Sequence, residues 1–273
     1  MDYGKIIELI YDARKFATDA ALRADVSEKG EDDFVTAVDF AISDFVKAGL
    51  RKIAPDVAFV TEEEDEHVES GKRFVLDPID GTTNLTRGGK QVSISLGYYA
   101  NGRVEFGVVF NPFYNEMFFA VRGHGAHYYD ATNGIEALLS VGVENYTEGK
   151  MSVADKTPDR AIIEFGANVS NKAMVDKNFA LARRVFLDCL DFRRNCSSAL
   201  ALCYIADGRL DGYFERRLKV WDYCAGTLIL EEAGGISSQW SGEPLTYTKP
   251  ATIVAAAPNT YAYLRDILSG EGE

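Results

Sequence analysis

The stretch FVLDPIDGTTNL, residues 74–85, begins as an apolar strand and ends in a tight polar turn. Asp77 and Asp80 lie where the apolar run ends, three residues apart, with Pro78 between them. Two carboxylates in one partly buried place raise each other's pKa unless a cation compensates their charge. Because oxygen ligands favour Mg²⁺ or Mn²⁺ over zinc or copper, this stretch predicts a divalent-cation site.

The residues of the turn suit a phosphate as well as a metal. Pro78 fixes its own φ and lacks a backbone donor, which stiffens the turn. Gly81 allows the backbone to come close to a ligand. If a helix begins here, the amides of Gly81, Thr82 and Thr83 would face outward and could bind an anion. The stretch therefore predicts that metals and a phosphate meet at one strand end.

Further carboxylates fall at the ends of predicted elements. Glu62 and Glu63 follow the run VAFVT, Asp39 lies within VTAVD, and Asp222 opens a helix after KVW. Ligand sites in α/β layer structures gather at strand ends. Each signal has an ordinary alternative, since Asp-Pro is usually a turn, EEEDE a solvated loop and Asp222 a helix cap. Because all of them fall at strand ends or helix starts, together they favour a metal site.

The composition limits the classes of partner and compartment. The 273 residues carry 42 acidic and 29 basic side chains, a net charge of −13, which disfavours nucleic acid and anionic membranes as partners. Four cysteines without a C-x-x-C pair, and only three histidines, argue against a zinc site or a disulfide framework. We expect buried free thiols and a cytoplasmic protein, since neither a signal peptide nor a membrane helix is predicted.

The first half of the chain predicts helices and an antiparallel sheet. Apolar residues with helical spacing mark the helices, and β-branched and aromatic residues between turn signals mark hairpins. The expected helices cover residues 2–24 and 38–53, and the expected strands lie at 57–61, at 73–77 and in hairpins over 91–121. A charged loop is predicted at 27–33, and a turn and edge region at 131–142.

The second half alternates strands with helices, which predicts a layered α/β arrangement. The expected strands are 161–166, 189–193, 210–215 and 252–257, and the expected helices are 174–188, 197–208, 221–235 and 259–268, with Asn259 as the N-cap of the last. A polar stretch at 143–150 predicts a division of the chain. Residues 1–145 would form an N-terminal α+β half with the antiparallel sheet and the metal-binding motifs, and residues 146–273 a C-terminal α/β half that completes the active site.

Three motifs, VLDPIDGTTN, FVTEEE and VWDYCAGTLILEEAGG, together closely resemble the inositol monophosphatase family. This family lies within the lithium-sensitive, Mg²⁺-dependent phosphatases that include fructose-1,6-bisphosphatase. The likeness covers nearly the whole chain in the right order: DFVTAVD fits the N-terminal piece, GHGAHYYDATNG the middle hairpin and DGYFE the substrate-side strand. The resemblance implies a layered α-β-α-β-α sandwich of the sugar phosphatase type, and a homodimer.

The resemblance also implies a set of metal ligands for two to three Mg²⁺ ions, which Mn²⁺ could replace. The first ion is expected on Glu62, Asp77 and the carbonyl of Ile79. The second is expected on three carboxylates: Asp77, Asp80 and Asp222. Glu62 would also hold a third, weaker ion, and Glu63 would support it.

The remaining roles follow from the same resemblance. Thr82 is expected to orient the attacking water, with Asp39 behind it, so that Thr82, Asp39 and Glu62 are the predicted catalytic residues. Gly81, Thr82 and Thr83 would meet the phosphate, and Glu215 would contact a substrate hydroxyl.

The function that these residues imply is hydrolysis of a phosphate monoester. A metal-activated water would attack phosphorus in line, and inositol monophosphate, fructose 1,6-bisphosphate or both would be the substrate. No G-x-S-x-G or C-x₅-R pattern signals a covalent nucleophile. Two alternatives stay open: a 3′(2′),5′-bisphosphate nucleotidase, for which we locate no adenine pocket, and a binding or regulatory protein on the same fold.

The chain departs from the family pattern on the substrate side. Cys196 and Ser198 stand where glycine and alanine are common, which leaves the contacts expected of Ser198 open. Arg216, Arg217 and Lys219 follow Glu215 closely. Because arginine forks match phosphate oxygens, we predict that these cations read a second phosphate, which would favour a bisphosphate substrate.

Overall fold

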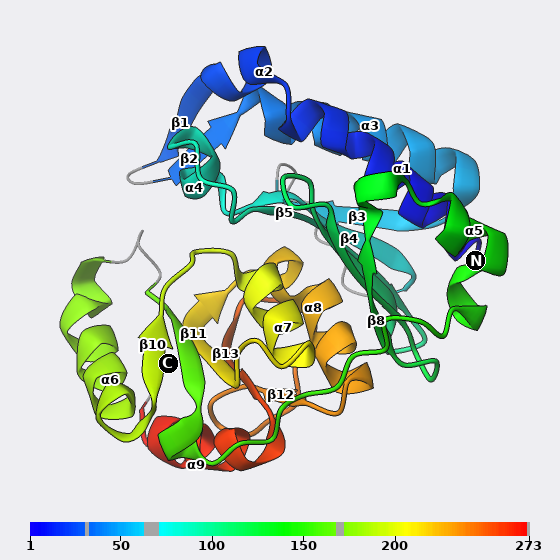
Figure 1. The fold of residues 1–273 in the computed structure, drawn as a ribbon. Helices are drawn as coiled ribbons and strands as arrows, with labels where there is room; N and C mark the ends of the chain where they lie inside the picture. The colour runs from blue at the N-terminus through cyan, green and yellow to red at the C-terminus, as the bar shows by residue number, and fades with distance from the viewer. Residues whose placement is uncertain (31–32, 63–70, 168–171, 272–273) are drawn as a thin grey trace.

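Two sheets divide the fold into five alternating layers of helix and strand (Figure 1). The structure is a computed structural model that describes residues 1–30, 33–62, 71–167 and 172–271. From one side to the other, the layers are α1 with α3, a six-stranded sheet, α7 with α8, a five-stranded sheet, and α6 with α9. The predicted α-β-α-β-α sandwich is confirmed.

The first layer consists of α1 (Tyr3–Ala17) and α3 (Ala37–Ile53), close to the predicted bounds. Apolar residues of both helices are buried against the six-stranded sheet, and Asp2 caps α1 by accepting from the Lys5 amide. A short α2 (Ala20–Ala24) follows α1. The loop predicted at 27–33 is wrong, because β1 (Val26–Gly30) and β2 (Asp33–Thr36) pair there as an antiparallel ribbon.

The six-stranded sheet has the order β3-β4-β5-β6-β7-β8, with β3 parallel to β4 and every other pair antiparallel. Its strands are β3 (Ala58–Thr61), β4 (Arg73–Asp80), β5 (Ser93–Ala100), β6 (Arg103–Asn111), β7 (Glu116–Val121) and β8 (Ala126–Asp130). The predicted hairpins are therefore confirmed. β4 is buried along its whole length because helices cover both of its faces: Phe74 packs toward the first layer and Val75 toward the middle one.

The middle layer consists of α7 (Ser198–Ala206) and α8 (Val220–Glu232), and it packs on both sheets. Glycines in the six-stranded sheet let α8 come close. A Cβ at Gly107 would lie 2.7 Å from the Ala225 carbonyl oxygen, and one at Gly97 would lie 2.5 Å from Cys224 Sγ. The backbone of α8 is thus held directly against the sheet whose strand β4 carries Asp77 and Asp80.

The five-stranded sheet has the order β10-β9-β11-β13-β12. Its strands are β9 (Ile162–Gly166), β10 (Asp191–Arg193), β11 (Gly212–Leu218), β12 (Ile236–Ser238) and β13 (Ala251–Ala256), covered by α6 (Val175–Asp188) and α9 (Pro258–Leu268). The strand β12 was not predicted. The N-cap of α9 is Ala257 rather than Asn259, because Pro258 occupies the first helical position, where its missing N–H costs nothing.

Shorter elements connect the two sheets. The region predicted as a turn at 131–142 holds α5 (Glu136–Val141). Single 3₁₀ turns lie at Ala131–Asn133, Val143–Asn145, Pro158–Arg160 and Lys172–Met174. The division into residues 1–145 and 146–273 stays a prediction: it falls between the sheets, but one apolar cluster of the middle layer joins both halves.

Two sequence expectations concern the cysteines and the membrane. All four cysteines are free, as predicted, but the expectation that they are buried is wrong for two of them: Cys203 and Cys224 are buried, whereas Cys189 is half-buried and Cys196 is exposed. Within the described ranges, no helix combines the length and apolarity that crossing a bilayer requires.

We expect Gly107→Ala to destabilise the protein, because the new methyl group would press on the backbone of α8. Overpacking of this kind costs about 1–3 kcal/mol. Urea unfolding followed by circular dichroism would measure the loss. The control is Gly270→Ala, where the added methyl meets open space and φ is ordinary; it should stay within about 0.5 kcal/mol of wild type. Equal stability of both variants would contradict the close packing of α8.

Candidate active site

Three carboxylates from two elements meet at one edge of the six-stranded sheet. Asp77 and Asp80 lie at the end of β4, and Asp222 lies in the first turn of α8. One oxygen of each lies within 4.8 Å of the other two. Asp77 is only 1% exposed, and Asp80 is 7% exposed. The structure thus brings together the three ligands that the sequence assigned to the second ion.

Glu62 joins this cluster from the neighbouring strand. Because β3 runs parallel to β4, with Thr61 opposite Leu76, the residue after β3 reaches the same edge of the sheet. The charge of Glu62 raises the pKa of Asp77 and of Asp222, which places it close to both. Glu63, the other acid expected here, lies outside the described residues.

The cluster has the electrostatics of a cation site. Burial, and then the charges of Glu62, Asp80, Asp222 and Asp39, raise the pKa of Asp77 well above its usual value. Asp77 Oδ1 is buried and has no hydrogen-bond partner among the described residues. A buried carboxylate oxygen without a partner is costly, and a divalent cation would both satisfy it and offset the repulsion. The residues present therefore fit a divalent metal ion.

Asp80 is held by the start of α7. Its Oδ2 accepts hydrogen bonds from Ser197 Oγ at 2.6 Å and from the Ala199 amide at 2.8 Å. Burial outweighs these bonds and raises the pKa of Asp80 to about 6. Ser197 is also the N-cap of α7. Ser197 is not among the predicted site residues, although a serine at the start of a predicted helix is an N-cap signal.

The turn after β4 places the predicted phosphate-binding residues beside the acids. Gly81 has φ of 96°, and a Cβ there would lie 2.8 Å from the Gln91 carbonyl oxygen. The short helix α4 (Thr82–Thr86) begins directly after it, with Thr83 exposed. Thr82 Oγ1 donates to the Ile79 carbonyl at 2.9 Å.

Asp39 lies in the first turn of α3 and is buried. Its Oδ2 accepts from the amide of Thr36 at 2.8 Å and from its hydroxyl at 2.7 Å. Its charge contributes to the raised pKa of Asp77, so it belongs to the same acidic region. The pairing of Asp39 with Thr82 stays a prediction.

The substrate-side residues Glu215 and Ser198 are connected through Tyr213. Tyr213 donates its hydroxyl hydrogen to Glu215 Oε2, and Ser198 Oγ lies 3.0 Å from the Tyr213 hydroxyl. The charge of Glu215 contributes to the raised pKa of Asp222. The structure therefore places both predicted residues near the acids and adds Tyr213, which the sequence analysis missed.

The expectation for Arg216 needs a correction. Side chains alternate along β11, and Arg216 points with Phe214 toward α6 and α9, away from the face that carries Glu215. Arg216 is 6% exposed, its guanidinium lies 4.5 Å above the Trp240 ring, and its Nε donates to Asn178 Oδ1. This side chain does not point toward the acids, so it cannot read a substrate phosphate there.

The other two predicted cations are exposed. Arg217 lies at an irregularity in the pairing of β11 with β13 and has φ of 69°. The backbone N–H of Lys219 donates to Asp222 Oδ2 at 2.8 Å, so Lys219 orients a proposed metal ligand through its main chain. Roles for the Arg217 and Lys219 side chains in binding stay predictions.

Glu164 and Asn195 form a buried link that the sequence analysis missed. Glu164 on β9 is 2% exposed, and its two oxygens accept from the Asn195 amide at 2.7 Å and from Asn195 Nδ2 at 2.9 Å. The Asn195 carbonyl accepts from Asn84 Nδ2 at 2.7 Å, which ties α4 to the segment before α7. A single acid within the apolar run AIIEFG was the available signal.

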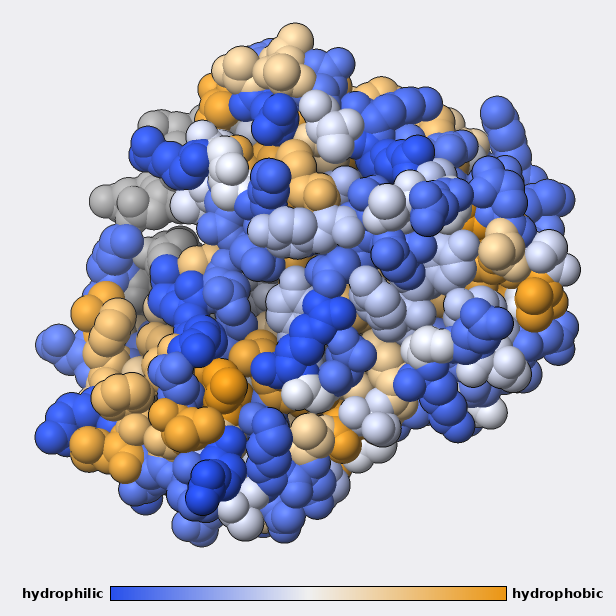
Figure 2. Space-filling view, viewed as in Figure 1, coloured by the Kyte–Doolittle hydropathy of each residue, from blue (hydrophilic) through white to orange (hydrophobic). Residues whose placement is uncertain are grey.

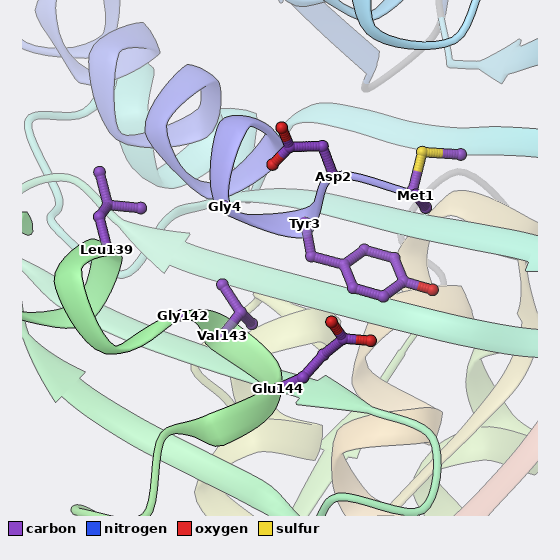
Figure 3. A pocket seen from close by; sticks show the side chains of 8 residues that line it. All are labelled: Met1, Asp2, Tyr3, Gly4, Leu139, Gly142, Val143 and Glu144. Atoms are coloured by element: carbon purple, nitrogen blue, oxygen red, sulfur yellow. The ribbon is translucent and has the colours of Figure 1, made fainter.

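A surface pocket of about 460 Å³ lies elsewhere, between the start of α1 and the segment after α5 (Figure 3). Its lining contains the carboxylates of Asp2 and Glu144 beside the Tyr3 phenol, and none of its lining residues is a lysine, arginine or histidine. Burial, and then the Glu144 charge, raise the pKa of Tyr3 to about 12. Since these groups would repel a phosphate, the pocket is not the candidate site.

A sequence profile of the inositol monophosphatase family matches residues 3–270. The chain belongs to this family. A Nus factor SuhB of Pasteurella multocida is 38% identical over 84% of this chain and 80% of its own. The extragenic suppressor protein suhB of Bartonella henselae superposes with a TM-score of 0.85 at 26% identity, over 99% of both chains. The IMPase of Thermotoga maritima does so with a TM-score of 0.82 at 25% identity, over 97% of this chain and 95% of its own.

The structure explains one departure from the inositol monophosphatase pattern. Cys196, where glycine is common, has φ of 62°, a left-handed conformation that glycine adopts without strain. Its carbonyl oxygen would lie 3.1 Å from a Cβ at Gly81. The backbone of this segment is therefore tightly packed against the turn after β4.

We expect Asp77→Asn to reverse its effect on stability when metal is added. Without a divalent cation, the variant removes a repelling charge and should be more stable than wild type. Because the pKa of Asp77 is raised above 3.8 in the folded state, wild type loses stability as this group ionises, and the gap should widen as pH rises. With Mg²⁺ at about 100 times its Kd, wild type should gain about 2.7 kcal/mol and become the more stable protein.

Urea unfolding in EDTA and in Mg²⁺ measures both effects. Asp44→Asn, an exposed carboxylate on α3, is the matched control and should respond to Mg²⁺ as wild type does. A wild-type protein that Mg²⁺ does not stabilise would contradict the cation site.

Proposed function

We propose that the protein is a Mg²⁺-dependent phosphomonoesterase. The observation that carries this proposal is the group of the buried Asp77 and Asp80 with the half-buried Asp222, with an unpartnered oxygen on Asp77, beside the turn that begins at Gly81. Membership of the inositol monophosphatase family supports it. We propose inositol monophosphate, fructose 1,6-bisphosphate or both as substrates. Replacement of Mg²⁺ by Mn²⁺, and inhibition by lithium, stay predictions.

The ions would be held by Glu62, Asp77, Asp80, Asp222 and the carbonyl of Ile79. When bound, Mg²⁺ would activate a water for in-line attack on phosphorus and stabilise charge on the phosphoryl oxygens. The chain's own groups would position the reactants. Because the Thr82 hydroxyl donates to the Ile79 carbonyl, its oxygen is left to accept a hydrogen bond, which suits orientation of the attacking water. The amides of Gly81, Thr82 and Thr83 would meet the phosphate.

Direct attack by water agrees with the state of the nearest serine. The Ser197 hydroxyl donates its hydrogen to Asp80 Oδ2 at 2.6 Å and serves as the N-cap of α7. A serine nucleophile needs an adjacent general base that accepts its proton. The acceptor of the Ser197 hydroxyl is Asp80, which we propose as a metal ligand rather than a base. This arrangement supports attack by water rather than a covalent intermediate on Ser197.

The substrate's second group decides between the remaining candidates. With Arg216 turned away, Arg217 and Lys219 are the cations from the predicted set that could meet a second phosphate, and both are exposed. A 3′(2′),5′-bisphosphate nucleotidase would need an aromatic or polar adenine site, and the described residues offer no specific observation in its favour. We therefore rank polyol and sugar phosphates first.

We expect Asp80→Asn to lower phosphate release at least about 100-fold, because it removes one charge from the proposed metal site. Asparagine keeps an oxygen that can accept from Ser197 and Ala199, so the fold should survive. Phosphate release would be followed with and without Mg²⁺ on inositol monophosphate, fructose 1,6-bisphosphate and adenosine 3′,5′-bisphosphate. Asp44→Asn serves again as control and should keep full activity. If wild type releases no phosphate from any of them at any Mg²⁺ concentration, the binding-protein alternative is favoured instead.

A second candidate is a role in protein contacts, which the surface of α6 favours. Five exposed apolar side chains lie on or directly after this helix: Val175, Phe179, Phe186, Leu187 and Leu190. The surface in the region of α6, at the lower left of Figure 2, contains many apolar atoms, drawn in orange and tan. Leu187 is 64% exposed and Phe186 is 53% exposed. An apolar patch of this kind typically marks a protein interface.

We propose that a second copy of the chain covers this face. Arg183, Arg184, Asp176 and Asp188 lie on the same helix, so two copies related by a twofold axis could pair opposite charges around the apolar centre. One relative is named Nus factor SuhB, a name that denotes a factor rather than an enzyme, so we retain a binding role as a candidate. The lack of a nucleic-acid partner stays a prediction.

We expect Phe186→Glu to convert a dimer into a monomer, because it would bury a charge in the proposed interface. Sedimentation equilibrium at micromolar protein would measure the mass. Ile236→Glu alters an exposed apolar residue on β12, away from α6, and should leave the dimer intact. A monomeric wild type would reject a second copy as the occupant.

A further inference from the structure

Three side chains on the substrate side form a directed hydrogen-bond chain. Ser198 lies in the first turn of α7, and Tyr213 and Glu215 lie on the same face of β11. Tyr213 is 2% exposed and donates to Glu215 Oε2, while Ser198 Oγ lies 3.0 Å from the Tyr213 hydroxyl. The residue at position 198 is one of the two where this chain departs from the family pattern.

The direction of this chain follows from a count of hydrogens. A tyrosine hydroxyl carries one hydrogen, and here it goes to Glu215. Ser198 must therefore donate its own hydrogen to the Tyr213 oxygen, which leaves Ser198 Oγ only its lone pairs for any further partner. Burial, and then the charge of Glu215, raise the pKa of Tyr213 well above its usual value, so the phenol stays protonated and keeps donating.

The backbone fixes the Glu215 carboxylate from a second side. β9 and β11 pair with Gly166 opposite Glu215. A Cβ at Gly166 would overlap Glu215 Oε2 and would come within 2.8 Å of Glu215 Cβ. The carboxylate thus lies directly over a glycine, with the Tyr213 hydroxyl holding one of its oxygens, and any side chain at position 166 would displace it.

The hydrogen-bonded group of Ser198, Tyr213 and Glu215 lies next to the proposed reaction centre. The residues on either side of Ser198, namely Ser197 and Ala199, hold Asp80. The charge of Glu215 contributes to the raised pKa of Asp222. A phosphate ester bound at the acids would therefore bring its alcohol portion toward Ser198 and Glu215.

We propose that Tyr213 is a positioning residue that fixes Glu215 and Ser198 as hydrogen-bond acceptors for hydroxyl groups of the substrate's alcohol, so that the site selects phosphate esters of polyols. The proposal rests on the proposed phosphatase function and adds the groups that set its specificity. An alcohol without hydroxyls cannot donate to Glu215 or Ser198 and so gains neither hydrogen bond, and sites built to bind a hydroxyl discriminate strongly against analogues that lack it.

The test compares two substrates. Inositol monophosphate carries free hydroxyls on its alcohol portion, whereas phenyl phosphate carries none. Tyr213→Phe removes only the hydroxyl that connects Ser198 to Glu215, a connection that we call the relay. We expect kcat/KM for inositol monophosphate to fall about tenfold, mainly through a higher KM, because a lost hydrogen bond to a charged group is worth about 1.5 kcal/mol or more. Turnover of phenyl phosphate should change less than twofold, and inhibition by free inositol should weaken while inhibition by inorganic phosphate does not.

Two further variants and one control make the test specific. The ratio of kcat/KM for inositol monophosphate to kcat/KM for phenyl phosphate should also fall in Ser198→Ala and in Gly166→Ala. The first variant removes an acceptor, and the second displaces Glu215. Tyr247→Phe removes another buried tyrosine hydroxyl, which pairs with Thr227 Oγ1 at 3.2 Å, and should leave the ratio unchanged. If Tyr213→Phe does not fold, Ser198→Ala carries the test.

The outcomes separate this proposal from the function on which it rests. Equal losses on both substrates, or an unchanged ratio in Tyr213→Phe and Ser198→Ala, would overturn the relay while leaving the phosphatase function intact. If wild type hydrolyses neither ester, the proposed function fails and the relay falls with it.

Discussion

Repulsion among buried carboxylates at the end of β4 is the constraint on which the rest of the structure depends. Oxygens of Asp77, Asp80 and Asp222 lie within 4.8 Å of one another. At this separation three ionised carboxylates repel one another unless a cation balances their charge. Burial raises the pKa of all three carboxylates and so favours their protonated, neutral forms. A divalent cation makes the same arrangement favourable, so the fold couples its most costly feature to ligand binding.

The middle layer of helices is what imposes this crowding. α7 presents Ser197 and the Ala199 amide to Asp80, and α8 carries Asp222 in its first turn. Both helix starts lie beside the acids, where the positive end of the helix dipole favours negative charge. The close packing of α8 on Gly107 leaves it no room to retreat from β4. The core thus fixes the distances between these acids.

The meeting of Asp77, Asp80 and Asp222 could be predicted from the sequence, while their role as metal ligands stays a prediction. Asp77 and Asp80 share one turn, and the other acids fall at element ends where any layered fold would gather them. Arg216 was placed wrongly because its closeness to Glu215 in sequence says nothing about which face of β11 it occupies. Glu164 and Asn195 were missed because their pairing links separate elements, and no single stretch of sequence displays it.

The two sides of the site obey different physics, and this explains where the chain departs from its family pattern. On the metal side, losing one carboxylate would change the charge that balances a bound cation, so we expect substitution there to be strongly penalised. On the alcohol side, hydroxyls can be added or removed as long as donors and acceptors still match. Ser198 and Cys196 lie on that side, and the serine extends a hydrogen-bond chain to Tyr213 that alanine could not make. Substrate preference can therefore change there without disturbing the acids.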